Sequence, residues 1–239
     1  MDKACLGFLK ITRIRPDRIF TDLSYFMQKR NYRGNIVALL LMILPVSVAF
    51  AESEKVRIST TEGDIIIELN SERAPESVAN FLTYVQEGFY EGTIFHRVID
   101  GFMIQGGGYT DNFMKKDTRA PIPNEANNGL KNRKYTIAMA RTNAPHSATS
   151  QFFINTVDNE FLNHTSMDLQ GWGYTVFGRV VEGFDVVDAI SGTRTGPGGP
   201  FPRDVPAETV RIESASIVMP EAANDQAAAL EQPAATQAQ

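Results

Sequence analysis

The sequence contains very few cysteine and histidine residues. Cys5 is the single cysteine among 239 residues, so a disulfide framework or a cysteine-based metal site within the chain is excluded. His96, His146 and His164 are far apart and lack the paired spacing of metal ligands. We therefore expect neither a metal site nor another cofactor.

The sequence also lacks the usual motifs of hydrolases and nucleotide-binding enzymes. The hydroxyl residues next to His146 do not form a nucleophile elbow, and no Asp/Glu pair stands out for acid–base catalysis. The glycines Gly106-Gly107-Gly108 are followed by no Lys-Ser/Thr pair and have no dinucleotide-binding strand–helix frame. We interpret these glycines as a tight passage of the backbone.

Basic charge is scarce outside the N-terminal region. Residues 1–51 contain eight Lys/Arg and three Asp, a net charge of +5, whereas residues 52–239 contain 15 basic and 25 acidic residues, a net charge of −10. A nucleic-acid partner requires a clustered basic face, so the acidic body of the chain argues against one. A hydrophobic content of 43% is too high for a disordered chain and indicates a globular protein.

Residues 1–51 match the pattern of a secretory signal peptide. Three basic residues precede the apolar run 36–48, and Ala49-Phe50-Ala51 supplies the small residues at which signal peptidase cleaves. The run is short for a membrane span of roughly 20 residues, but an uncleaved anchor or a buried helix is the alternative. We expect translation to start at Met27, cleavage to follow Ala51, and no stable membrane insertion afterwards.

Residues 52–219 begin with a hairpin and a helix. Val56–Thr60 and Asp64–Leu69 predict two strands, because β-branched residues flank the turn signal Glu62-Gly63. Pro75 predicts the start of a helix, in which apolar residues then recur at i, i+3, i+4 and i+7.

Short apolar runs separated by Gly, Asn and Pro turns follow. They predict five further strands, Ile94–Ile99, Met103–Gln105, Tyr135–Ala140, Gln151–Asn155 and Tyr174–Val180. A second amphipathic helix fits Phe184–Ile190, and Val210–Val218 predicts a last strand. Many strands with two helices predict a mainly β fold, a closed β-barrel capped by helices. Residues 220–239 are rich in Ala and Gln and lack aromatics, which predicts a disordered tail, either solvated or a tether for a partner.

The stretch from Phe95 to Gly107 has two interpretations from the residues alone. On a strand, Phe95, Arg97 and Ile99 would share one face, and a charged residue on that face requires either solvent or a function. Arg97 is therefore either simply exposed beside ordinary core residues, or part of a site.

Four blocks of sequence resemble the cyclophilin family of peptidyl-prolyl cis-trans isomerases, and they occur in the family's order: Phe95–Gly107, Thr136–Thr142, Ser150–Asn155 and Gly171–Gly178. The resemblance extends from about Val56 to Val218, essentially the whole predicted domain, and its details are most similar to the bacterial, periplasmic branch. It implies a closed eight-stranded antiparallel β-barrel capped by two α-helices, with the substrate groove on its outer face, and a periplasmic location.

The resemblance also implies which residues act on an X-Pro peptide bond. Arg97 corresponds to the main catalytic residue, and Gln105 to the residue that holds the substrate carbonyl. The proline pocket would be lined by Phe102, Met103, Phe153 and Leu162. The backbone near Arg141 and Thr142 would pair with the peptide, and Gln151 belongs to the same substrate-binding set.

Two positions depart from the family's pattern. Phe161 stands where many eukaryotic members have a Trp that hydrogen-bonds cyclosporin, and because Phe cannot donate a hydrogen bond we predict weak cyclosporin sensitivity. Tyr174 stands where a pocket His is common; it can still form a pocket wall, but its hydrogen bonding differs.

The function implied by the resemblance is X-Pro isomerisation during the folding of exported proteins. Its partners would be proline-containing peptides and unfolded exported proteins, and since the sequence gives no basis for an oligomer we expect a monomer. A proline-peptide-binding chaperone without relevant catalysis is one alternative, although a pure binder would not need Arg97. A structural envelope protein held by an uncleaved leader is another.

Overall fold

The computed structural model describes residues 53–218. The predictions made for the leader, residues 1–51, and for the tail, residues 220–239, lie outside these residues. Within the described part, no helix combines the length and the apolar character needed to cross a membrane.

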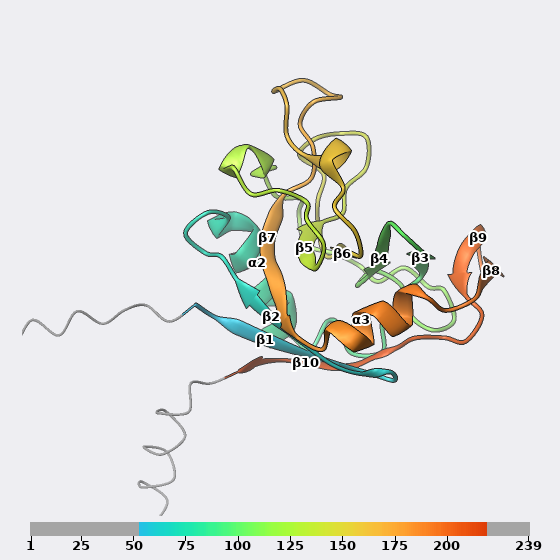
Figure 1. The fold of residues 1–239 in the computed structure, drawn as a ribbon. Coiled ribbons are helices and arrows are strands. Elements are labelled where there is room, and N and C mark those ends of the chain that lie inside the picture. Colours follow the sequence, from blue (N-terminus) through green and yellow to red (C-terminus); the bar gives the residue numbers. More distant parts are fainter. Residues whose placement is uncertain (1–52, 219–239) are drawn as a thin grey trace, which may run out of the picture. The chain divides into compact units, whose positions relative to one another are not determined.

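Eight strands form one antiparallel sheet that curls strongly on itself (Figure 1). Their order across the sheet is β10-β1-β2-β7-β5-β6-β4-β3. The strands are β1 Lys55–Thr60, β2 Gly63–Leu69, β3 Arg97–Ile99, β4 Met103–Gly106, β5 Thr136–Met139, β6 Phe152–Asn155, β7 Val176–Glu182 and β10 Ile212–Val218. Together with the two α-helices described below, these strands confirm the predicted mainly β fold for residues 53–218.

The predicted closure of the barrel is not confirmed. Within residues 53–218, β3 and β10 are the two ends of the strand order and share no ladder. The segment before β3 instead touches the start of β10 and the residues before it. Ile94 and Arg211 form an isolated bridge, and Phe95 N–H donates to the Val210 carbonyl at 2.9 Å. Ile212, the first residue of β10, donates to the Thr93 carbonyl at 2.8 Å and accepts from Gly92 N–H at 2.9 Å. The sheet is therefore a strongly curled half-barrel whose edges meet at these short contacts.

The segment before β3 also differs from its prediction. The strand begins at Arg97 and not at Ile94, and Phe95 is fully buried in the main core. Arg97 and Ile99 do share the outer face of β3, as the alternation of a strand requires.

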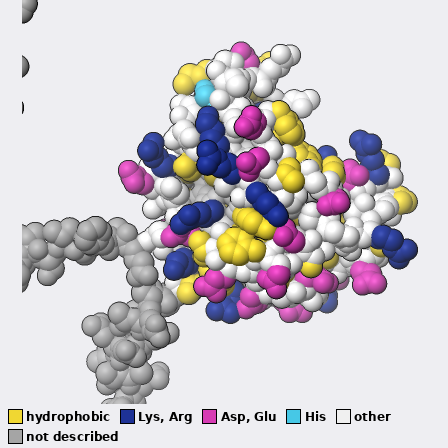
Figure 2. Space-filling view, in the orientation of Figure 1, with side chains coloured by type: hydrophobic (Ala, Val, Ile, Leu, Met, Phe, Trp, Pro, Cys, Tyr) yellow, Lys and Arg dark blue, Asp and Glu magenta, His cyan; other side chains and the backbone are white. Residues whose placement is uncertain are grey.

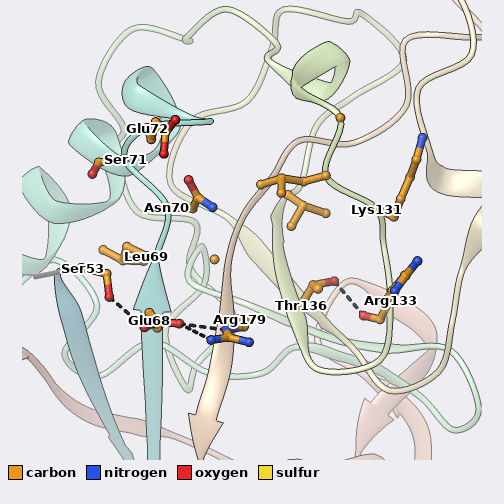
Figure 3. A pocket seen from close by; sticks show the side chains of 14 residues that line it. Ser53, Glu68, Leu69, Asn70, Ser71, Glu72, Lys131, Arg133, Thr136 and Arg179 are labelled. Atoms are coloured by element: carbon orange, nitrogen blue, oxygen red, sulfur yellow. Dashed lines mark hydrogen bonds and ion pairs between the residues drawn. The ribbon is translucent and has the colours of Figure 1, made fainter. Parts of the chain in front are cut away.

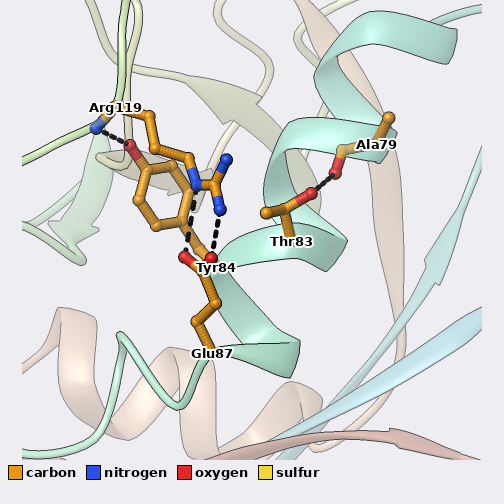
Figure 4. Close-up of polar contacts among 5 residues, drawn as sticks. All are labelled: Ala79, Thr83, Tyr84, Glu87 and Arg119. Carbon is orange, nitrogen blue, oxygen red and sulfur yellow. Dashed lines mark hydrogen bonds and ion pairs between the residues drawn. The ribbon is translucent and has the colours of Figure 1, made fainter.

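Helix α2, Pro75–Gln86, is held at both ends by side chains from distant loops. At its N-terminus the Glu125 carboxylate accepts hydrogen bonds from the backbone N–H groups of Glu76 and Ser77, at 3.1 and 2.9 Å, which satisfies donors that the helix itself leaves unpaired. At its C-terminus Glu87 forms an ion pair with Arg119, whose backbone N–H donates to the Tyr84 hydroxyl at 2.9 Å (Figure 4).

Helix α3, Phe184–Ser191, follows β7 directly and is short. Gly183 caps its start with φ +83, and a Cβ there would lie 2.2 Å from the Asp64 carbonyl oxygen. Both the positive φ and the close approach of β2 therefore require glycine at this position. Two 3₁₀ turns, η2 Ala126–Asn128 and η3 Glu160–Leu162, lie in the long connections.

A second, two-stranded sheet was not predicted from the sequence. It pairs β8, Thr195–Gly198, with β9, Phe201–Pro206. The segment is rich in glycine and proline between Gly196 and Pro206, residues that disfavour strands, so propensity alone indicates a loop. β9 lies beside β3 at one edge of the half-barrel (Figure 1).

Apolar side chains gather on both faces of the sheet. The main core fills the inside of the curl, where residues of the strands pack with Val78, Phe81 and Tyr84 of α2 and with Val187 and Ile190 of α3. A smaller outer cluster lies on the other face and consists of Met103, Ala138, Phe153, Leu162 and Val176. Figure 2 shows one side of the molecule, in the orientation of Figure 1, on which charged side chains of both signs are interspersed.

Candidate active site

The outer face of the sheet carries one row of side chains from neighbouring strands. The register pairs Arg97 of β3 with Gln105 of β4, Gln105 with Phe153 of β6, and Phe153 with Ala138 of β5. Residues in register project to the same side of a sheet. The row therefore places a guanidinium, an amide and an aromatic ring beside one another.

A cavity of about 110 Å³ opens on this row. Its lining combines the outer cluster with two arginines and a glutamine: Arg97, Phe102, Met103, Gln105, Ala140, Arg141, Phe153, Leu162 and Tyr174. Met103, Phe153 and Leu162 are buried at 2%, 4% and 8% exposure, so the floor is rigid and apolar. The cavity is small, of the scale of one compact side chain rather than a cofactor.

Arg97 lies at the polar edge of the cavity. Its Nη1 lies 3.5 Å from Gln105 Oε1, at the limit of a hydrogen bond, and Gln105 Nε2 donates to Gln151 Oε1 at 3.0 Å. The Arg97 side chain is 42% exposed. Its guanidinium donors are therefore available to a ligand that enters the cavity.

Another wall of the cavity consists of two aromatic rings and a guanidinium in contact. The rings of Phe153 and Tyr174 meet edge to face with centroids 5.6 Å apart. The Arg141 guanidinium lies 4.5 Å above the Tyr174 ring and donates from Nε to the Gly173 carbonyl at 2.9 Å. Tyr174 is thus fixed as a wall by packing and by a cation–π contact.

Three of the residues implied by the resemblance lie outside the cavity lining. Gln151 contacts the lining only through its side chain, which accepts a hydrogen bond from Gln105. Thr142 is exposed, and both its N–H and its hydroxyl group contact Ser147 Oγ, at 3.0 and 2.9 Å. Phe161 is 74% exposed and stacks on Phe102 with ring centroids 5.6 Å apart, so it extends the apolar rim.

The comparisons with known proteins agree with this geometry. The family model described as cyclophilin type peptidyl-prolyl cis-trans isomerase/CLD matches residues 55–217. The chain belongs to the cyclophilin family. It is 61% identical over 163 residues to peptidyl-prolyl cis-trans isomerase cyp18 of Streptomyces antibioticus, which covers 68% of this chain and 98% of that protein. It is also 61% identical over 158 residues to peptidyl-prolyl cis-trans isomerase B of Escherichia coli K12, over 66% of this chain and 96% of the relative.

A solved structure gives the same fold. The crystal structure of a cyclophilin type isomerase of Cryptosporidium parvum in the presence of the dipeptide Ala-Pro is 28% identical, with a TM-score of 0.56, and the match covers 70% of this chain and 99% of that one. Together with the closely similar named relatives, these matches identify this cyclophilin as a peptidyl-prolyl cis-trans isomerase.

A network of buried asparagines, not predicted from the sequence, contacts the backbone of the pocket residue Phe102 in this cyclophilin. Asn159 donates to the Phe102 carbonyl at 2.9 Å and to Asn155 Oδ1 at 2.8 Å, while Asn155 donates to Asn132 Oδ1 at 3.2 Å. All three asparagines are nearly or fully buried. They fix the turn that carries Phe102, and the only sequence signal for them was polar residues next to apolar strands.

His96 adjoins Arg97 but takes no part in the cavity. It is 3% exposed, and its ring lies 4.7 Å from Tyr109 and 5.4 Å from Phe201. Burial lowers the pKa of His96 from 6.5 to about 4, and the nearby charge of Arg97 acts in the same direction. The imidazole is therefore neutral at pH 7, and no chemical step needs it.

A larger groove lies elsewhere among the described residues, and it contains an ion pair between two of its lining residues (Figure 3). It has a volume of about 790 Å³ and is lined by β2, β5, β7 and the loop around Lys131. Its main carboxylate, Glu68, forms an ion pair with Arg179 at 2.7 Å and accepts a hydrogen bond from Ser53. These partners lower the pKa of Glu68. Among residues 53–218, no group of three or more His, Cys, Asp or Glu could hold a metal ion.

Proposed function

We propose that Arg97 is the catalytic residue of this isomerase and that the 110 Å³ cavity receives the proline ring. The observation that carries the proposal is the placement of the partly exposed Arg97 guanidinium at the edge of a small cavity with an apolar floor. The Cryptosporidium parvum relative, whose crystal structure was obtained in the presence of the dipeptide Ala-Pro, supports the choice of ligand.

The reaction requires little covalent chemistry from the protein. The X-Pro amide has a rotation barrier of about 18–20 kcal/mol, because the prolyl nitrogen lone pair is conjugated with the carbonyl. In the twisted state the nitrogen becomes pyramidal and its lone pair is localised. A guanidinium beside that nitrogen interacts more strongly with the twisted state than with the planar one, which lowers the barrier.

The remaining residues hold the substrate while the bond rotates. Phe102, Met103, Phe153 and Leu162 form an apolar slot that orients the ring. Gln105, which is kept in place by Gln151, is suited to hold the substrate carbonyl. The chain at Arg141 and Thr142 runs on from β5 beside the cavity, where its backbone can pair with an extended peptide.

A peptide-binding chaperone is the less favoured function. Such a protein would need the apolar slot but not a guanidinium at its edge. The named relatives, at 61% identity, are isomerases.

The decisive experiment is the Arg97→Ala variant in a protease-free assay of X-Pro isomerisation. We expect kcat/KM to fall about 100-fold or more, since removal of one transition-state donor typically costs about 3 kcal/mol, while the fold persists. Arg133→Ala removes an arginine from the large groove and serves as the matched control with unchanged activity. Equal turnover by the wild type and Arg97→Ala would refute the assignment.

We further propose that the enzyme works in the periplasm, as a monomer, on exported proteins. Export is supported by the signal-peptide pattern of residues 1–51, in which basic residues are followed by an apolar run and then by the small residues of a cleavage site. Cell fractionation with intact-mass measurement tests it: a periplasmic chain that begins near Glu52 is expected, and a membrane-bound chain that retains residues 36–51 would contradict it.

A further inference from the structure

The hairpin β8–β9 is attached to the strand that carries Arg97. Phe201 of β9 is the attachment point, with ring centroids 5.4 Å from His96 and 5.1 Å from Tyr109. Phe113 packs on the same ring at 6.2 Å. These contacts bury His96 and fix the position of β9 relative to β3.

The hairpin brings one carboxylate to the catalytic strand. Asp204 Oδ2 lies 3.8 Å from Arg97 Nε, and the Asp204 side chain is 23% exposed against 42% for Arg97. Nε is the inner nitrogen of the guanidinium, whereas Gln105 is approached by the terminal Nη1 at 3.5 Å. Asp204 and Gln105 therefore contact different nitrogens of the same planar group.

The backbone at Asp204 is unusual. Its φ is +68, one of three positive values at non-glycine residues among those described. A second, Phe113 with φ +60, belongs to the contacts of Phe201. Left-handed backbone at a non-glycine residue costs free energy and persists where surrounding structure imposes it, often near functional sites.

We propose that Asp204 is a positioning residue for Arg97: it holds the guanidinium by Nε so that the Nη groups face the cavity. Arginine has several rotatable bonds, and a donor that is already oriented loses less entropy when it meets the twisted amide. Arg203 Nε also lies 3.6 Å from Asp204 Oδ2, so it competes with Arg97 for this oxygen. The Arg203 side chain is 82% exposed, however, and its ion pair is therefore weakened by solvent. The inference rests on the proposed role of Arg97.

The first test is Asp204→Asn, because Asn tolerates the left-handed backbone and keeps the shape while it removes the charge. We expect kcat for an X-Pro peptide to fall about fivefold, with KM within about twofold of wild type and an unchanged melting temperature. Asp64→Asn is the matched control, since Asp64 also pairs with an arginine, Arg57 at 2.6 Å, but on the far hairpin β1–β2.

The second test separates positioning from mere stabilisation of the hairpin. Asp204→Gly relieves the positive φ and removes the carboxylate, so a positioning role predicts the same loss of kcat as in Asp204→Asn. Wild-type kcat in either variant would overturn the proposal, as would an equal fall in the Asp64→Asn control.

A spectroscopic readout keeps this inference distinguishable from the role of Arg97 in catalysis. The Nε–H signal of Arg97, assigned by its loss in Arg97→Lys, is expected to be visible in the wild type and to shift or broaden in Asp204→Asn. An unchanged Nε–H signal would overturn positioning even if Arg97→Ala is inactive. A shifted signal with full activity in Arg97→Ala would leave the contact real but refute the catalytic role on which the proposal depends.

Discussion

Strand β4 presents two neighbouring residues to two different environments. Ile104 points into the half-barrel and is fully buried, opposite Val98 of β3 and Ile154 of β6. Gln105, the next residue, points to the outer face between Arg97 and Phe153. One strand thus supplies the core with one face and the cavity with the other.

The two faces are governed by different physical requirements. On the inner face, free energy favours any well-packed apolar side chain of suitable volume. On the outer face, the proposed function requires polar residues that the protein leaves partly unsatisfied, so that a substrate can complete their interactions. The long 3.5 Å contact between Arg97 and Gln105 is in keeping with this requirement.

The comparison predicts opposite outcomes for two adjacent substitutions. Ile104→Ala removes a fully buried side chain, and we expect the free energy of unfolding to fall by about 3 kcal/mol, the usual cost of such a cavity. Gln105→Ala is expected to cost less than about 1 kcal/mol in stability but to lower kcat/KM about tenfold, because the hydrogen bond that we propose between Gln105 and the substrate carbonyl is lost. Denaturant titration and an isomerisation assay measure the two effects.

The assay must be made per folded molecule, without denaturant and at a temperature at which Ile104→Ala is fully native. Ile104→Val, which removes a single methyl group, is the conservative control on the inner face. If Ile104→Ala lost as much kcat/KM as Gln105→Ala, the two faces would not be separable, and the comparison would be wrong.

The elements with strong local signals were predictable from the sequence. The hairpin β1–β2 and helix α2 follow from alternation, from the turn at Gly63 and from Pro75 at the helix start. The hairpin β8–β9 was not predictable, because its Gly and Pro residues are held as strands by tertiary packing around Phe201. Whether the sheet closes into a barrel or stays a half-barrel was likewise not predictable, because it depends on contacts between residues far apart in the chain, such as Ile94 with Arg211.

The residues of the candidate site were predictable only from the four sequence blocks taken together. Spacing alone left Arg97 ambiguous, and the resemblance of four blocks gave its partners. What it could not give is the support around them: Asn159 behind Phe102 and Asp204 beside Arg97. Their polar side chains are common in loops, and only the folded structure shows which of them contacts a pocket residue.

His96, the buried neighbour of Arg97, is expected to make the stability of the protein depend on pH. Because burial lowers the pKa of His96 to about 4 from 6.5, the unfolded chain binds the proton more readily than the folded one. The free energy of unfolding that depends on a neutral His96 is therefore fully present above pH 6.5 and is lost as pH falls towards 4. We expect about 2 kcal/mol to be lost between about pH 7 and pH 5, measured by denaturant titration.

His96→Phe supplies the control for this pH dependence. A phenyl ring can occupy the same place against Tyr109 and Phe201, but it does not titrate. The carboxyl groups with lowered pKa, such as Glu68 and Glu87, titrate below this window and affect both proteins equally. Identical slopes for the wild type and His96→Phe across this pH range would show that His96 is not responsible.

The smallest effect is expected at the rim of the outer face. Phe161 is exposed and stacks on Phe102, so Phe161→Trp should be accommodated with no loss of stability or isomerase activity. The indole N–H adds a donor that Phe lacks, and one hydrogen bond of about 1 kcal/mol would tighten cyclosporin binding about fivefold.

Isothermal titration calorimetry measures the affinity for cyclosporin, with Phe161→Tyr as a control for added ring polarity. Equal affinity of wild type and Phe161→Trp would mean that the missing donor does not set cyclosporin sensitivity, and that the shape of the rim must do so.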